Sequence, residues 1–286
     1  MKNRIWTLLA GFLLLLSACG TTSSAPAAQD TSEEVTVAPE NTEAEEETVS
    51  ETNETAAAPE FHPMPYDTAL DTLDDEYGAD AFAHVLDHAD SRYYVANDFY
   101  NMDTGGNLHL LPHFQTYQQT TEYSCGCASA LMVLNYFGNH DYNEMEICEL
   151  AETDTSKGTS VEGLVGFFEQ LGWKTEFHGD TEYRFQTIEE CEAYLLETLD
   201  SGVPIMVDWV DWAGHWQVLI GLDTCETDSP YDDVLIMADP YDVTDHYQDG
   251  YYTVPFGRFF DMWREGPCTQ KTDPYKQPFV VAFPSA

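Results

Sequence analysis

The stretch "QTTEYSCGCASALMVLNYFG", from Gln119 to Gly138, decides the fold. A polar run gives way at Cys125 to apolar residues at helical spacing, which predicts a buried helix that ends at Gly138. Cys125 stands at the mouth of this helix, where the helix dipole stabilises a thiolate. Cys127 lies about 200° away around a helix, so we expect it to begin the helix proper and face the core. Cys125 is therefore the predicted nucleophile.

Two residues near Cys125 could assist a nucleophilic attack by its thiol. Gln119 lies six positions upstream, and its side-chain amide could donate a hydrogen bond to an oxyanion formed beside the sulfur. Gly126 follows the thiol directly and lets the backbone approach a substrate closely. The alternative is that Cys125 and Cys127 are both structural, because a free cysteine is often a small buried apolar residue.

Two downstream residues complete the pattern. His215 follows Gly214 and enters the apolar run "HWQVLIGLD", and Asp239 ends the apolar run "VLIMAD" just before Pro240. If these runs are neighbouring antiparallel strands, the two residues meet at one edge, as the base and orienting group of a triad do. Gly214 and Trp216 flank the histidine and, with Gly126, are candidates for the wall of a substrate cleft. Core packing is an equally good explanation for the tryptophan.

The remaining periodicity predicts an α+β fold. Helices are expected first and strands afterwards, which favours an antiparallel sheet. The predicted helices are 128–138, 142–152, 159–173, 187–202 and 254–263, and the predicted strands are 203–210, 215–223, 232–240, 250–254 and 278–283.

The segment Gln119–Gly138, together with His215 and Asp239, resembles the papain-like cysteine peptidases, in particular a bacterial branch similar to the bacteriocin-leader-processing peptidases. The resemblance covers roughly residues 110–285. It implies a papain-like fold in which a helical N-terminal half packs on an antiparallel sheet. It also implies that Cys125 is the nucleophile, His215 the base, Asp239 the orienting group and Gln119 the oxyanion donor.

Two features depart from that family. Cys127 stands where the family frequently has proline, which leaves the catalytic atoms unchanged but offers an alternative thiol. The leader-processing members are fused to membrane transporters and this chain is not, so cleavage at a double glycine is not implied.

The N-terminus has the pattern of a bacterial lipoprotein. Lys2 and Arg4 precede the apolar run "IWTLLAGFLLLL", and "LSACG" follows. This predicts a signal peptide over 1–18 and lipid attachment at Cys19. We expect anchoring on the extracytoplasmic face of a bacterial cell membrane, in a Gram-positive cell. Residues 19–60, acidic and rich in Thr, Ser, Glu and Pro, are expected to form a disordered stalk.

Two further segments follow the stalk. We expect a partly helical N-terminal extension over 61–109, either packed or regulatory, and the peptidase domain over 110–286. The formal net charge is −42, and only 10 residues are Lys or Arg. Nucleic acid is therefore excluded as a partner. Of the 52 acidic residues, 11 lie in 21–60, so the folded part is acidic too. Solubility explains this charge better than a preference for cationic substrates.

Other polar clusters fit metal binding poorly. Five residues lie close in sequence at and after the end of the third predicted strand, but their spacing differs from that of an EF-hand loop; they are Asp239, Asp242, Asp245, His246 and Asp249. Nothing pairs with His109 or His113 at zinc spacing. We expect no metal and no other cofactor. A disulfide between Cys225 and Cys268 is left open.

These patterns predict a monomeric, lipid-anchored extracytoplasmic cysteine peptidase that hydrolyses amide bonds in a peptide or protein substrate. One alternative is a surface-binding lipoprotein on the same fold without activity. Another is an acyl-transfer enzyme, of transglutaminase or transpeptidase type, in which an amine replaces water. The sequence leaves open the substrate and whether residues 61–109 inhibit the site.

Overall fold

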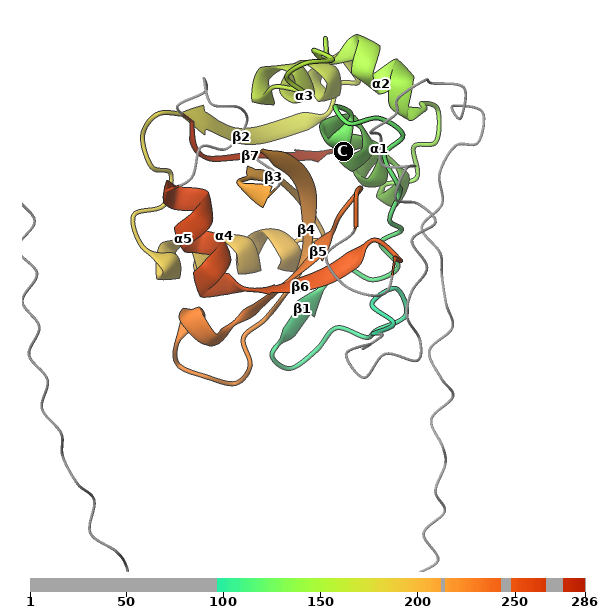
Figure 1. Ribbon diagram of the computed structural model, residues 1–286. Coiled ribbons are helices and arrows are strands. Elements are labelled where there is room, and N and C mark those ends of the chain that lie inside the picture. Colours follow the sequence, from blue (N-terminus) through green and yellow to red (C-terminus); the bar gives the residue numbers. More distant parts are fainter. Residues whose placement is uncertain (1–96, 212–213, 243–247, 266–274, 286) are drawn as a thin grey trace, which may run out of the picture. The chain divides into compact units, whose positions relative to one another are not determined.

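The computed structural model describes residues 97–211, 214–242, 248–265 and 275–285 (Figure 1). All of them belong to one unit of the chain, residues 56–286. The predicted signal peptide, the stalk and residues 61–96 of the predicted extension lie outside the described residues. Among the helices that the structure describes, none is long and apolar enough to cross a membrane.

In the part of the chain that the structure describes, five α-helices form where the sequence has helical periodicity. They are α1 (Cys125–Tyr136), α2 (Glu144–Leu150), α3 (Val161–Gln170), α4 (Ile188–Asp200) and α5 (Phe256–Glu265). Side chains cap three of them at the N-terminus: Asn143 forms a capping box on α2, Ser160 accepts the N–H of Gly163 on α3, and Thr187 caps α4. The prediction that Cys127 begins the first helix is wrong, because α1 starts at Cys125. Cys125 is thus itself at the helix N-terminus.

The strands form one antiparallel sheet, with the first strand before α1 in the chain and the other strands after α3. Its strands are β1 (Leu108–Leu110), β2 (Lys174–Asp180), β3 (Ile205–Trp209), β4 (His215–Asp223), β5 (Val234–Ala238), β6 (Tyr251–Pro255) and β7 (Lys276–Phe283). The order is β2-β7-β3-β4-β5-β6, with β1 also paired to β4, and every described pair is antiparallel. A short 3₁₀ turn, Pro230–Asp232, precedes β5. The α+β class with an antiparallel sheet is confirmed.

Two strands were not predicted from the sequence. β1 pairs with β4 and crosses the boundary expected between extension and peptidase domain. β2 has the sequence "KTEFHGD", lies at the edge of the sheet and is exposed along most of its length. It therefore lacks the apolar alternation by which a half-buried strand is recognised.

The helices pack on the sheet so that α1 meets β4. α1 contacts β4 and also α2 and α3, while α3 contacts β2 and β7 (Figure 1). The hydroxyl of Ser129 on α1 donates to the carbonyl of Trp216 on β4 at 3.2 Å. In the β4–β5 ladder Val218 pairs with Ala238. The start of β4 therefore lies beside the end of β5, next to the helix.

Candidate active site

His215 and Asp239 are hydrogen-bonded where two interior strands of the sheet end. His215 is the first residue of β4 and Asp239 follows the last residue of β5. The distance from His215 Nε2 to Asp239 Oδ1 is 2.6 Å, and the two side chains are 5% and 0% exposed. The same carboxylate oxygen accepts the backbone N–H of Tyr241 at 2.9 Å. With Nε2 engaged, Nδ1 is the ring nitrogen that remains for a second partner.

That second partner is Cys125. The Cys125 side chain lies near enough to the imidazole to raise its pKa together with Asp239. Burial alone would lower the pKa of His215, but the Asp239 carboxylate and Cys125 outweigh it and hold the pKa well above its usual range. The structure thus brings the cysteine, the histidine and the aspartate together. A protonated imidazole beside the sulfur is what a thiolate–imidazolium pair requires.

Gln119 lies beside the same strand end. Its backbone N–H donates to the carbonyl of Pro240 at 2.8 Å, and its side chain is buried. The side-chain Nε2 donates one hydrogen bond to the carbonyl of Thr121 at 2.6 Å. A primary amide has two N–H groups, so one remains available to an oxyanion. The buried Oε1 atom has no hydrogen-bond partner among the described residues.

The three predicted cleft residues have different roles in the structure. Trp216 is 1% exposed, and its indole N–H donates to the carbonyl of Thr159 at 2.8 Å. These contacts agree with core packing, the alternative interpretation of Trp216. Gly126 is also buried, and a Cβ there would lie 2.8 Å from Thr159 Cβ. Gly126 is needed for packing of α1 rather than for an open approach to substrate. Gly214 is partly exposed with φ of 118°, a conformation that favours glycine.

The second cysteine of the motif faces a separate set of side chains. Cys127 is fully buried, with its sulfur 3.2 Å from Thr153 Oγ1 and 3.4 Å from Thr159 Oγ1. It also interacts with Cys148 on α2. The helical rotation between positions 125 and 127 therefore separates the two thiols, as the sequence predicts.

Glu144 is a buried acid near the site that the sequence did not single out. It begins α2, is 0% exposed, and accepts hydrogen bonds from Thr120 in the loop before Cys125. In the sequence it has the pattern of an ordinary acidic residue in the first turn of a helix, where the dipole favours a negative charge. Only the contact with the loop distinguishes it.

The described acidic residues after β5 accept hydrogen bonds from the backbone. Asp239, Asp242 and Asp249 accept backbone N–H groups of Tyr241, Gly250 and Tyr251, respectively. Asp245 and His246 lie outside the described residues. Among the residues that the structure does describe, no group of three or more His, Cys, Asp or Glu is arranged to hold a metal ion.

The remaining histidines and cysteines have local partners. His109 Nδ1 is 2.6 Å from Asp200 Oδ1, and His113 Nδ1 is 3.0 Å from the carbonyl of Tyr100. The described cysteines are free thiols; they are Cys125, Cys127, Cys148, Cys191 and Cys225. Cys268 lies outside the described residues, so a disulfide between it and Cys225 stays open.

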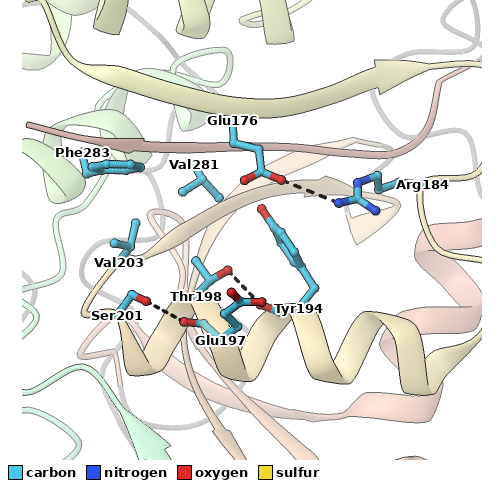
Figure 2. A pocket seen from close by; sticks show the side chains of 9 residues that line it. All are labelled: Glu176, Arg184, Tyr194, Glu197, Thr198, Ser201, Val203, Val281 and Phe283. Carbon is cyan, nitrogen blue, oxygen red and sulfur yellow. Dashed lines mark hydrogen bonds and ion pairs between the residues drawn. The ribbon is translucent and has the colours of Figure 1, made fainter. Parts of the chain in front are cut away.

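A cavity of about 590 Å³ lies between α4 and strands β2 and β7 (Figure 2). Its lining includes none of the four candidate catalytic residues. Several of its polar groups are paired within the protein: Arg184 with Glu176 at 3.7 Å, and the Thr198 and Ser201 hydroxyls with carbonyls one turn earlier in α4. We therefore place the chemistry at the α1–β4 contact and not in this cavity.

A helix that presents a thiol to an imidazole on an antiparallel sheet, with a carboxylate behind the ring, is the arrangement of the papain-like cysteine peptidases, and fold and site assign the protein to that class. More particularly, the chain belongs to the Peptidase_C39 like family, whose sequence model matches residues 112–269, more than half of the chain. The protein is thus a cysteine peptidase.

The solved structures that are similar to this chain include two peptidase domains. One is the peptidase domain of Streptococcus ComA, a bifunctional ABC transporter involved in a quorum sensing pathway, with 18% identity, a TM-score of 0.41, and coverage of 60% of this chain and 100% of that domain. The other is a double glycine motif protease from an AMS/PCAT transporter in complex with the leader peptide, with 15% identity, a TM-score of 0.39, and coverage of 60% and 91%. A search of curated protein sequences found no match to the chain.

Proposed function

We propose that the protein is a lipid-anchored extracytoplasmic peptidase that hydrolyses peptide bonds by means of Cys125, His215, Asp239 and Gln119. One observation carries this proposal: the buried His215 imidazole interacts with the Cys125 thiol on one side and is bonded to Asp239 at 2.6 Å on the other. Such a bridge orients the ring and supports its positive charge, which is what a cysteine nucleophile needs.

In the proposed reaction His215 takes the proton of the Cys125 thiol, and the sulfur attacks the carbonyl carbon of the substrate. The Gln119 amide and the backbone N–H of Cys125 donate to the oxyanion, since the first N–H groups of a helix have no partner within it. His215 then protonates the leaving amine, and water hydrolyses the thioester. General acid–base catalysis of this kind contributes roughly 10²–10⁴ in rate, and one oxyanion donor about 10²–10³.

The substrate is proposed to be a peptide or protein, which agrees with the family. The protease from the AMS/PCAT transporter was solved with its leader peptide, but cleavage after a double glycine is not transferred to this chain. The protein is proposed to act as a monomer and without a cofactor.

Thiol labelling combined with turnover tests this function. The wild type should carry one thiol that reacts much faster than the others, and an epoxide inhibitor of papain type should block that thiol and the hydrolysis of a peptide mixture together. Cys125→Ala should abolish turnover, whereas Cys127→Ala, the matched change two positions away, should leave a reactive thiol at position 125. The reverse result would disprove the assignment of the nucleophile.

The same assay separates the alternatives. Products that incorporate an added amine instead of water would identify an acyl-transfer enzyme. A wild type without any hyper-reactive thiol would indicate a binding protein.

The membrane anchor is a separate part of the proposal, because Cys19 lies outside the described residues. The support for it is the sequence "LSACG" after the apolar run. Cells given an alkyne-bearing fatty acid should label the full-length protein, and Cys19→Ser should remove the label. Labelling that persists in Cys19→Ser would contradict this anchor without affecting the catalytic proposal.

A further inference from the structure

Glu144 is a buried carboxylate with an unusual set of partners. Its side chain is 0% exposed although it begins a helix. The backbone N–H of Thr120 donates to Oε1 at 3.0 Å and to Oε2 at 3.2 Å, and the Thr120 hydroxyl donates to Oε2 at 2.9 Å. The Tyr117 hydroxyl donates to Oε2 at 3.4 Å. A single side chain on α2 therefore holds one residue of the loop before α1 through both its backbone and its hydroxyl.

That loop contains the candidate oxyanion donor. Thr120 lies between Gln119, whose backbone is bonded to Pro240, and Thr121, whose carbonyl accepts the Gln119 amide. The N–H and hydroxyl of Thr121 donate to Ser124 Oγ at 3.2 and 2.7 Å, and Cys125 is the next residue. Glu144 thus holds Thr120, which is covalently joined to Gln119 on one side and to Thr121, bonded to Ser124 before the nucleophile helix, on the other.

Burying the Glu144 carboxylate costs desolvation free energy. Burial raises the pKa of Glu144, and hydrogen bonds from Ser124, Thr120 and Tyr117 oppose that rise. The other titratable groups that face it are the Tyr117 hydroxyl from the loop and the thiols of Cys127 on α1 and Cys148 on α2. Since an apolar side chain at such a site would avoid the desolvation cost, a buried acid is better explained by the geometry that it imposes.

We propose that Glu144 is a positioning residue of the peptidase: it clamps Thr120 and so holds the Gln119 amide where the oxyanion forms. Glu144 does not touch substrate and acts through Gln119. This inference rests on the proposed function, because an oxyanion donor matters only if Cys125 attacks a carbonyl.

The test is Glu144→Gln, which keeps the shape of the side chain and weakens its capacity to accept hydrogen bonds. The matched control is Glu146→Gln, the same change on the same helix at an exposed residue, where glutamine can still accept the backbone N–H of Asn143. For Glu144→Gln we expect kcat to fall about tenfold to a hundredfold with little change in KM, as for a weakened oxyanion donor. We expect Glu146→Gln to match the wild type.

Two further measurements show whether the fall in kcat depends on Gln119. The rate of Cys125 alkylation by iodoacetamide, followed against pH, should stay within about twofold of the wild type, because this reaction forms no oxyanion. In a Gln119→Ala background, Glu144→Gln should cause almost no additional loss of kcat. An alkylation rate that falls with kcat, or a full loss in the Gln119→Ala background, would overturn the proposal.

Hydrogen exchange makes the test independent of peptidase activity. The backbone amide of Thr120 should exchange at least about tenfold faster in Glu144→Gln than in the wild type or in Glu146→Gln, since its carboxylate acceptor is replaced by a neutral amide that accepts more weakly. Unchanged exchange would refute the clamp even if the enzyme is active. A wild type without turnover would refute the proposed function, and exchange would then still decide whether the clamp exists.

A milder variant keeps the test valid if Glu144→Gln does not fold. Thr120→Val removes the hydroxyl bond to Glu144 and keeps the backbone bond and the side-chain shape. It should lower kcat in the same direction, by a smaller factor, without slowing alkylation. A kcat equal to that of the wild type would count against the proposal.

Discussion

At His215, burial and the neighbouring side chains act on the pKa of the imidazole in opposite directions. Its ring is almost completely removed from solvent, which by itself favours the neutral imidazole. The carboxylate of Asp239 and the side chain of Cys125 reverse that preference and raise its pKa. The positive charge is therefore stable only because its two partners are in place.

Asp239→Asn should lower the pKa of His215, because the charge that opposes desolvation is removed while an acceptor for Nε2 is kept. The basic limb of the pH dependence of Cys125 alkylation should then move to lower pH. A profile that coincides with that of the wild type would mean that Asp239 does not support the imidazolium.

The same residue makes folding stability depend on pH. A raised pKa in the folded state stabilises the protein fully below the ordinary value of 6.5, and this contribution is lost as the pH rises through the folded pKa. The free energy of unfolding, measured in urea over this range, should therefore fall with rising pH in the wild type. The fall attributable to His215 should be smaller in Asp239→Asn.

Gly126→Ala tests the tight packing behind the nucleophile. The new Cβ would lie 2.8 Å from Thr159 Cβ and 3.1 Å from Trp216 Cδ1, so we expect a loss of roughly 1–3 kcal/mol in the free energy of unfolding. Gly166→Ala in α3 is the matched control, because nothing lies within 4 Å of its Cβ position. The control should be neutral or stabilise by up to about 1 kcal/mol. Equal urea midpoints for the two variants would contradict the packing argument.

At the scale of elements, the seven-residue helix α2 positions the loop before the nucleophile helix. Its N-terminus carries Glu144, and the capping box of Asn143 and Glu146 fixes where that terminus lies. A helix this short has little stability of its own, so its position depends on the cap and on packing.

Asn143→Ala should cost about 0.5–2 kcal/mol of stability, because the N–H of Glu146 loses its side-chain acceptor. It should also speed hydrogen exchange in the segment 117–121, which Glu144 holds. Asn139→Ala is the control, since Asn139 accepts one N–H in a turn and caps no helix. Thermal unfolding of both variants, with exchange measured on the same samples, checks the prediction.

At the scale of the whole molecule, charge is the dominant feature. A net charge of −42 on 286 residues produces repulsion that favours expanded states. Because salt screens exposed charges with a Debye length of about 10 Å at 0.1 M, added salt should relieve part of this repulsion. The melting temperature should therefore rise between low and physiological ionic strength. Two different monovalent salts should give the same rise at equal ionic strength, and a melting temperature that falls in both would contradict the argument.

The helices and most strands were predictable because their local patterns are strong. The helical periods around α1, α3 and α4 and the apolar runs of β3, β4 and β5 each report burial on one or both faces. β2 escaped prediction because an exposed edge strand needs no apolar pattern, and β1 because three residues are too few to show one. Trp216 was ambiguous for a similar reason: a tryptophan beside a histidine has the same sequence whether it packs in the core or lines a cleft.

The sequence by itself determined the α+β class, the position of Cys125 at a helix start, and the candidates Gln119, His215 and Asp239, since each depends on local spacing and on apolar runs. Only the tertiary structure decided that Trp216 and Gly126 form tight packing and that Glu144 holds Thr120. Those contacts join segments that are far apart along the chain, and their free energy depends on geometry and burial in the folded state, which local sequence patterns do not report.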